Sequence, residues 1–184
     1  MLRSNRMKKV LSTTLLMLLA VSPILATPKS NGGSSDDKQV AKQIRKNLVT
    51  MPYYGVFDNL AYKYEDGVVT LYGQVVRPTV KSDAGNIVAR IPGVDQVINK
   101  IEVLPLSSFD DRIRLATYRA VYGKPGLNRL ALQAVPPIHI IVNRGQVTLE
   151  GVVPTRSDAN LAYIAARGVA GSFSVTNNLQ VEKE

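Results

Sequence analysis

Apolar side chains along this chain change their spacing at regular intervals, and these changes predict where helices and strands occur. Residues 40–48 place apolar side chains about 3.6 residues apart, which is the period of a helix with one buried face. Residues 60–64 and 69–75 alternate apolar and polar side chains, as half-buried strands do. The Glu65-Asp66-Gly67 segment between them suits a hairpin turn, so this part predicts a helix followed by a β-hairpin.

A second helix and a third strand follow the hairpin. Residues 84–91 return to the helical period, with Ser82 as the expected N-cap, and Pro92-Gly93 is expected to end this helix. Residues 97–103 then alternate again and predict a closing strand. The predicted order of elements is therefore αββαβ.

This order occurs twice because one stretch of sequence is duplicated. Residues 67–73 read Gly-Val-Val-Thr-Leu-Tyr-Gly, and residues 145–151, which lie 78 positions later, read Gly-Gln-Val-Thr-Leu-Glu-Gly. A Ser-Asp-Ala triplet and a closing Val-x-Asn strand follow in each copy. We therefore predict an α+β fold of two tandem domains, residues 36–104 and 109–182, each with a three-stranded mixed sheet and two helices on one face.

The first helix of each copy begins with acidic residues. Asp36 or Asp37 is expected to cap this helix in the first copy, and Asp110 or Asp111 in the second. The spacing of apolar residues also predicts which face of the second-copy helix is buried. The residues on that face are Ile113, Ala116, Ala120 and Val121.

Six glycines recur at matching positions of the two copies, and these positions mark them as structural. Glycine adopts backbone conformations that other residues avoid, and it lets a helix approach a sheet closely. No Gly-x-Gly-x-x-Gly or Gly-Lys-Ser/Thr sequence occurs, so these glycines do not form a phosphate-binding loop. The six are Gly67, Gly73 and Gly93 in the first copy and Gly145, Gly151 and Gly171 in the second.

The N-terminus is typical of a secretory signal peptide. Cations within residues 3–9 precede an apolar run over residues 10–20, and Ala26 suits the position before a cleavage site. We interpret residues 1–26 as a cleaved signal peptide and residues 27–35 as a disordered spacer, with a retained N-terminal anchor as the alternative. Cleavage would leave 19 Lys+Arg against 14 Asp+Glu, a net charge of +5 instead of +9.

The residues that catalysis or metal binding would need are scarce. There are no cysteines, and His139 is the sole histidine, so neither a thiolate nor a paired-histidine metal site is available. His139 is expected on the solvent side or the edge of a strand. Asp83 and Asp158 recur in the two copies, but each follows a serine at a predicted helix start. We interpret Ser82 and Ser157 as caps and the aspartates as partners of the helix dipole, and we predict no enzyme, cofactor or metal site.

These features together resemble the BON domain, which is named after bacterial OsmY and nodulation proteins. The resemblance extends over about residues 36–182. It implies an exported periplasmic protein of two such domains, without enzymatic activity, that associates with phospholipid membranes or other envelope components. The second copy departs from the family pattern at Gly171-Ser172-Phe173-Ser174. The matching residues are Gly67, Val69, Leu71, Gly73, Val75, Ala84, Val88, Gly93, Val94, Val97 and Asn99, and then Gly145, Val147, Leu149, Gly151, Val153, Ala159, Gly171, Val175 and Asn177.

Cations gather on the first helix of each copy, in the second copy together with tyrosines and also just beyond the helix, and they are the candidates for lipid binding. A guanidinium or an ammonium group can contact lipid phosphate while a phenol lies at headgroup depth. The alternative for each residue is an ordinary solvated helix face. The candidates are Arg112, Arg114, Tyr118, Arg119, Tyr122, Lys124 and Arg129 in the second copy, and Lys38, Lys42 and Lys46 in the first.

We therefore expect a non-enzymatic exported envelope protein that associates with anionic phospholipid surfaces. The alternative is a periplasmic protein-interaction or stress-protective module, active in osmotic stress or as a chaperone-like protein, whose strand edges engage envelope proteins. Export from the cytoplasm argues against a nucleic-acid partner. The sequence leaves the oligomeric state and the individual partner open.

Overall fold

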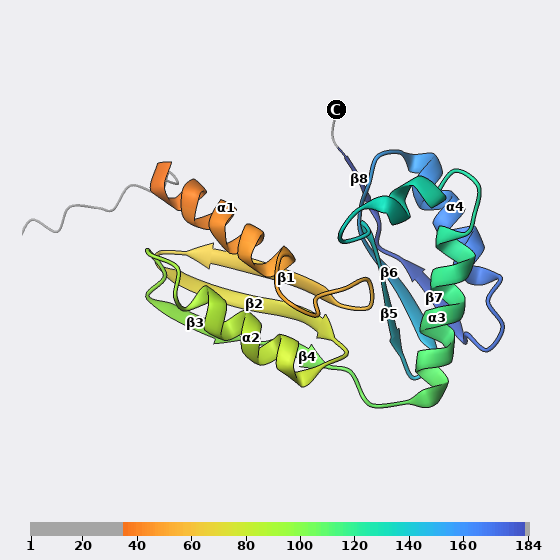
Figure 1. Cartoon of the computed structure of the whole chain (residues 1–184), viewed down its shortest axis with the longest axis horizontal. Coiled ribbons are helices and arrows are strands. Elements are labelled where there is room, and N and C mark those ends of the chain that lie inside the picture. Colours follow the sequence, from red (N-terminus) through yellow and green to blue (C-terminus); the bar gives the residue numbers. More distant parts are fainter. Residues whose placement is uncertain (1–34, 183–184) are drawn as a thin grey trace, which may run out of the picture. The chain divides into compact units, whose positions relative to one another are not determined.

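The computed structural model describes residues 35–182, which form two successive domains with matching elements (Figure 1). The predicted signal peptide and residues 27–34 of the predicted spacer lie outside the described residues. The first domain comprises α1 (Ser35–Val49), β1 (Asn59–Glu65), β2 (Val68–Val75), α2 (Pro78–Val88), β3 (Gln96–Asn99) and β4 (Glu102–Val103). The second comprises α3 (Ser108–Tyr122), the 3-10 helix η1 (Asn128–Leu132), β5 (Ile138–Asn143), β6 (Gln146–Val153), α4 (Arg156–Arg167), β7 (Ser174–Asn177) and β8 (Gln180–Val181).

The sheets of the two domains have the same topology and register. In the first sheet β2 is central, pairs antiparallel with β1, and pairs in parallel with β3 and then β4. In the second sheet β6 takes this place between β5 and the β7 and β8 segments. Val69 lies opposite Val97, and Val147 lies opposite Val175. The predicted α+β fold and its αββαβ repeat are thus confirmed, with each third strand divided into two segments.

An asparagine side chain marks the point at which each third strand divides. The Asn99 amide nitrogen donates to the Lys81 carbonyl of α2 at 2.8 Å, and its oxygen accepts from the Ile101 N–H at 3.1 Å. Asn177 forms the corresponding pair of bonds with a carbonyl of α4 and with the N–H two residues further along. The Val-x-Asn sequence of both copies therefore fastens the third strand to the preceding helix.

Gly73 and Gly151 occupy equivalent positions in the central strands, as predicted. Their φ angles are +119° and +121°, which side chains disfavour, and a Cβ atom at either position would run into a backbone carbonyl of the neighbouring segment. The hairpin turns repeat as well. Asp66-Gly67 and Arg144-Gly145 have positive φ angles throughout, as a two-residue type I′ turn requires.

Each domain buries its own core between one face of its sheet and its helices. Val69 and Leu71 of β2 and Val147 and Leu149 of β6 are at most 1 % exposed, as the alternating pattern predicts. The helices α1 and α2 pack against each other beside the first core, and α3 and α4 do so beside the second. The sheets thereby position the outer faces of α1 and α3 toward solvent.

Several helix starts differ from the predicted ones. The prediction that Ser82 is a cap is wrong, because α2 begins at Pro78 and the Ser82 hydroxyl donates to the Thr79 carbonyl at 3.0 Å. Proline suits the first position of a helix, since its missing N–H group would have no partner there. The prediction for Ser157 is also wrong. Thr155 caps α4, and its hydroxyl oxygen accepts a bond from the N–H of the third helical residue at 3.1 Å.

Candidate functional site

The start of α3 is fixed by contacts to the capping residue and to the β5–β6 turn. Ser107 is the N-cap, and its hydroxyl oxygen accepts a hydrogen bond from the Asp110 N–H at 3.2 Å. The buried Asp110 carboxylate accepts bonds from the N–H groups of Arg144 and Gly145 at 2.9 and 2.8 Å. The prediction that Asp110 or Asp111 caps this helix is therefore wrong. Asp110 instead joins the helix to the turn.

The prediction that Arg114 faces a lipid surface is wrong, because its side chain lies in the interior. Arg114 is 2 % exposed, and its Nη2 donates to the Val142 carbonyl of β5 at 2.7 Å. Its Nη1 donates to the Asp111 carboxylate. The guanidinium group therefore holds α3 against the edge of the second sheet and cannot reach a membrane.

The tyrosines of α3 also lie deeper than predicted. Tyr122 is buried, and its hydroxyl donates to the Ile138 carbonyl at 2.7 Å and accepts from the Ile138 N–H at 3.0 Å. Burial raises the pKa of the Tyr122 phenol above its usual range. Tyr118 is half-buried, with its ring near those of Tyr122 and Phe57. Ala116 and Ala120 are half-buried, and the buried residues of α3 are Asp110, Ile113, Arg114, Thr117, Val121 and Tyr122.

Three exposed residues, Arg112, Leu115 and Arg119, follow one another along α3, and Leu115 stands where this helix borders a hollow shared with residues 55–58. Intervals of three and four residues place these side chains on one face of the helix. Leu115, which the sequence interpretation missed, is 48 % exposed although it is apolar. The sequence did indicate this exposure, because Leu115 falls outside the predicted buried face of the helix. We call these three residues the α3 stripe.

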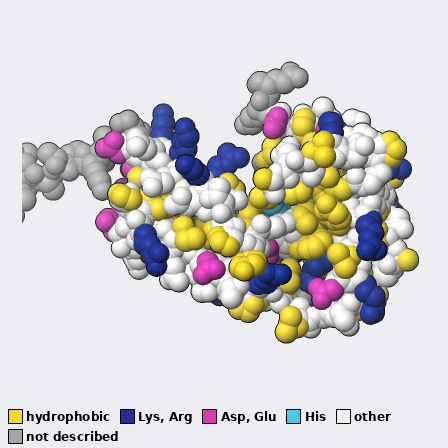
Figure 2. All heavy atoms as spheres, viewed as in Figure 1, with side chains coloured by type: hydrophobic (Ala, Val, Ile, Leu, Met, Phe, Trp, Pro, Cys, Tyr) yellow, Lys and Arg dark blue, Asp and Glu magenta, His cyan; other side chains and the backbone are white. Residues whose placement is uncertain are grey.

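The corresponding helix of the first domain, α1, presents lysines along its exposed face, and an exposed apolar residue, Val49, stands at its end. Lys38, Lys42 and Lys46 are exposed and recur every four residues along α1, where Figure 2 shows basic side chains in dark blue. A shallow groove follows these lysines, and the other residues along it are glutamines and an asparagine. The α1 lysines can therefore attract anions, and the one exposed large apolar side chain on this helix, Val49, lies in its last turn.

Lys124 and Arg129, the remaining candidates, differ in their surroundings. Lys124 is exposed, whereas Arg129 donates to the buried Asp158 carboxylate at 2.8 Å. The Thr155 hydroxyl donates to the same carboxylate at 2.8 Å. Burial raises the pKa of Asp158, but the hydrogen bonds from Arg129 and Thr155 outweigh burial and lower this pKa below its ordinary value. Arg129 therefore holds the start of α4.

This lowered pKa predicts that the second domain loses stability in acid. Because the pKa of Asp158 is lower in the folded state, its ionised form stabilises the fold above about pH 4, and the contribution disappears as the pH falls through the folded-state pKa. Asp158→Asn is expected to lower the free energy of unfolding at neutral pH and to have little effect at a pH below the folded-state pKa of Asp158. Urea unfolding at both pH values measures this difference, and an equal loss at both would contradict it.

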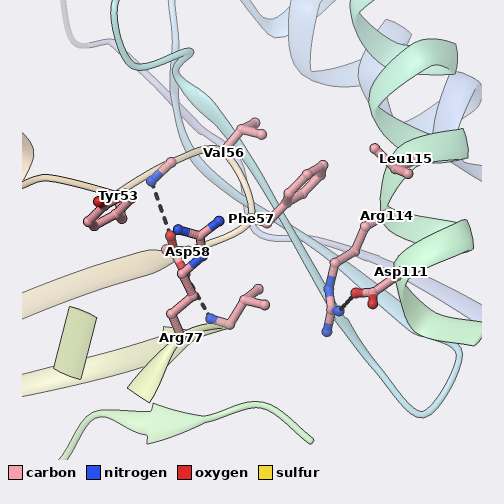
Figure 3. Close-up of a pocket in the computed structure, with 10 residues that line it drawn as sticks. Tyr53, Val56, Phe57, Asp58, Arg77, Asp111, Arg114 and Leu115 are labelled. Carbon is pink, nitrogen blue, oxygen red and sulfur yellow. Dashed lines mark hydrogen bonds and ion pairs between the residues drawn. The ribbon is translucent and has the colours of Figure 1, made fainter. Parts of the chain in front are cut away.

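The described residues belong to one compact unit, which contains a hollow of about 530 Å³ (Figure 3). The hollow is lined by Tyr53, residues 55–58 and 76–77, and Asp111, Arg114 and Leu115 of α3. The Asp58 carboxylate is engaged there, because it accepts bonds from the N–H groups of Gly55 and Val76 at 3.1 and 2.8 Å. Burial raises the pKa of Asp58, and these hydrogen bonds partly oppose it. No serine, cysteine or histidine lines the hollow, so its lining assembles no nucleophile–base pair of the hydrolase type.

His139 lies on β5, which is an edge strand, as predicted. Its ring centre is 5.6 Å from that of Tyr54, and burial lowers the pKa of the imidazole. Among residues 35–182 no three His, Asp or Glu side chains are grouped so that they could hold a metal ion. None of the helices in this part of the chain is long and apolar enough to cross a bilayer.

Comparisons with known proteins found one family model and a few solved structures similar to this chain. The BON domain family model matches residues 36–105 and 127–183. No curated protein matches the chain. The chain is similar to a solved structure of CdsD, a structural protein of the type III secretion system of Chlamydia trachomatis, at 11 % identity and a TM-score of 0.31, over 78 % of this chain and 92 % of that one. A structure of the C-terminal domain of CdsD has 13 % identity and a TM-score of 0.27, over 77 % and 96 %.

Proposed function

Because the chain belongs to the BON-domain family, which is non-catalytic and envelope- or membrane-related, we propose that it is an exported, non-enzymatic envelope protein that binds anionic phospholipid surfaces. The cationic and apolar N-terminus supports export to the periplasm by a cleaved signal peptide. The observation that carries the lipid proposal is the α3 stripe, in which Arg112 and Arg119 flank the exposed Leu115.

The α3 stripe combines the two interactions that hold a helix at a membrane surface. A cation close to an anionic bilayer contributes about 1 kcal/mol, and an arginine can also bind a phosphate with two hydrogen bonds. Leu115 can enter the interfacial region, where apolar side chains of such helices are buried. The α1 lysines add longer-range electrostatic attraction to the anionic bilayer. The second domain is therefore expected to determine the affinity for lipid.

Removing the two exposed arginines is expected to weaken lipid binding strongly. The variant Arg112→Gln with Arg119→Gln loses about 2 kcal/mol of attraction, which corresponds to a roughly 30-fold weaker affinity. Co-sedimentation with phosphatidylglycerol vesicles at low salt measures this change. The fold should be unaffected, since both residues are exposed on the outer face of α3. Equal binding by this variant and by the unaltered protein would contradict the assignment.

Two further variants serve as matched controls. Lys42→Gln with Lys46→Gln removes the same charge from α1, and we expect a smaller loss of affinity because lysine lacks the bidentate geometry of arginine. Arg114→Gln removes a buried cation, so it should lower stability by about 1.5–3 kcal/mol without changing the affinity of the folded fraction. Raised salt should weaken binding by the unaltered protein because it screens the exposed charges.

A second candidate function is a protein-interaction or stress-protective module of the periplasm. Tyr72 and Ile98, which are 39 % and 38 % exposed on strands of the first sheet, favour it because they offer apolar area to a polypeptide. If the protein does not bind anionic vesicles at low salt, the lipid proposal fails and this second function remains. A pull-down from an envelope fraction with the Tyr72→Ser and Ile98→Ser variants as controls would then test it.

A further inference from the structure

Three segments meet at one end of each domain: the start of the first helix, the hairpin turn and the residue before the third strand. In the second domain the start of α3 and the β5–β6 turn lie at the same end (Figure 1). The backbone is equivalent in the two copies, since the Asp95 N–H donates to the Gly67 carbonyl at 2.7 Å and the Phe173 N–H donates to the Gly145 carbonyl at 2.8 Å. We call each meeting point the domain tip.

The side chains at the two tips have opposite character although their backbones match. The second residue of the first helix, the first residue of the hairpin turn and the residue before the third strand are exposed in both domains. These positions are Asp36, Asp66 and Asp95 in the first domain, and Phe109, Arg144 and Phe173 in the second. At these three positions each aspartate of the first domain is therefore replaced by a phenylalanine or an arginine in the second.

The two phenylalanines form an aromatic pair outside the core of their domain. Phe173 is 76 % exposed and Phe109 is 38 % exposed, and their ring centres are 6.0 Å apart. The second core includes neither residue. The Arg112 guanidinium lies 5.9 Å from the centre of the Phe109 ring, so the α3 stripe begins beside this pair. Exposed aromatic rings next to arginines suit the surface of an anionic membrane, where phosphates lie above apolar acyl chains.

We propose that the tip of the second domain inserts Phe109 and Phe173 into the interfacial region of an anionic phospholipid membrane, while Arg112 and Arg144 contact its phosphates. The proposal rests on the proposed function and adds an insertion point to it. The charge at the tip favours an anionic lipid surface over the pairing of two second tips, because such a pair would bring their arginines together. The neighbouring Asp111 carboxylate is paired with Arg114. The first tip, with its three aspartates, is not expected to enter.

A tryptophan placed at the tip reports insertion directly, because the protein contains no tryptophan. In Phe173→Trp, phosphatidylglycerol vesicles should shift the emission to shorter wavelengths, and brominated acyl chains should quench it at least about twofold. The matched control is Asp95→Trp, which places the same probe at the first tip and should show neither change. Unchanged emission of Phe173→Trp in a protein that still co-sediments would overturn the tip proposal and leave the α3 stripe assignment intact.

The contribution of the rings can be separated from that of the charges by salt. Phe109→Ser with Phe173→Ser should lower the residual binding at high salt by at least about tenfold, while Arg112→Gln with Arg119→Gln should mainly lower binding at low salt. Circular dichroism melts verify that each variant is folded. If the unaltered protein binds no vesicles, both proposals fail. If it dimerises without vesicles and the serine variant does not, the tip is a contact between copies, which overturns the lipid assignment.

Discussion

Replacing Leu149 with alanine is expected to lower the free energy of unfolding of the second domain by about 2–5 kcal/mol. Leu149 is fully buried in the central strand β6, so the shorter side chain leaves a cavity that the sheet and helices fill only partly. The chain has no cysteine, and each domain is small, so no cross-link compensates for this loss. Leu71→Ala should have the same effect on the first domain.

Hydrogen exchange during denaturant unfolding measures this effect for each domain, since two domains need not unfold in one transition. Leu132→Ala is the matched control. Leu132 is 87 % exposed, so its truncation should change the free energy of unfolding by no more than about 0.5 kcal/mol. If Leu149→Ala leaves the free energy of unfolding unchanged, Leu149 does not contribute to the core as described.

The second large effect is expected at a glycine. Gly151→Ala should lower the free energy of unfolding by at least about 3 kcal/mol, because the strained backbone alone costs about 1–3 kcal/mol and the new Cβ also collides with a backbone carbonyl. Gly73→Ala should behave in the same way in the first domain. Thermal melts compare these variants with the unaltered protein.

Gly55→Ala provides the control for this prediction. A Cβ atom at Gly55 meets nothing within 4 Å, and its φ angle is not positive. Its replacement should therefore change stability by less than about 1 kcal/mol. If the Gly55 and Gly151 variants melt alike, the collision in the central strand does not determine stability.

The strands and the repeat could be predicted because both depend on local patterns. Val69 and Leu71 alternate with polar residues, and the glycines recur with a constant offset, so no tertiary information is needed. The burial of Arg114 could not be predicted in this way. It depends on the Val142 carbonyl of β5, which lies 28 positions away in the sequence and which the guanidinium group reaches only in the folded domain.

The helix starts and the tip of the second domain also could not be predicted fully from local sequence patterns. Ser82 resembled a cap because a Ser-Asp-Ala sequence preceded an apolar stripe, yet proline can begin a helix earlier, and Pro78 does. The unusual Gly171-Ser172-Phe173-Ser174 segment was visible in the sequence as a departure from the family pattern. Its pairing with Phe109 was not visible, because only the fold brings the two rings together.

The division of each third strand has a consequence for self-association. An uninterrupted edge strand offers a row of N–H and C=O groups to which another strand can add. In the first sheet the edge that the third strand forms consists of segments of four and two residues, and the Asn99 side chain already occupies the Ile101 N–H between them. A single chain that carries two like sheets holds them at high local concentration, where pairing of the wrong edges is a hazard. The asparagine that fastens strand to helix therefore also makes this edge a poorer template for another strand.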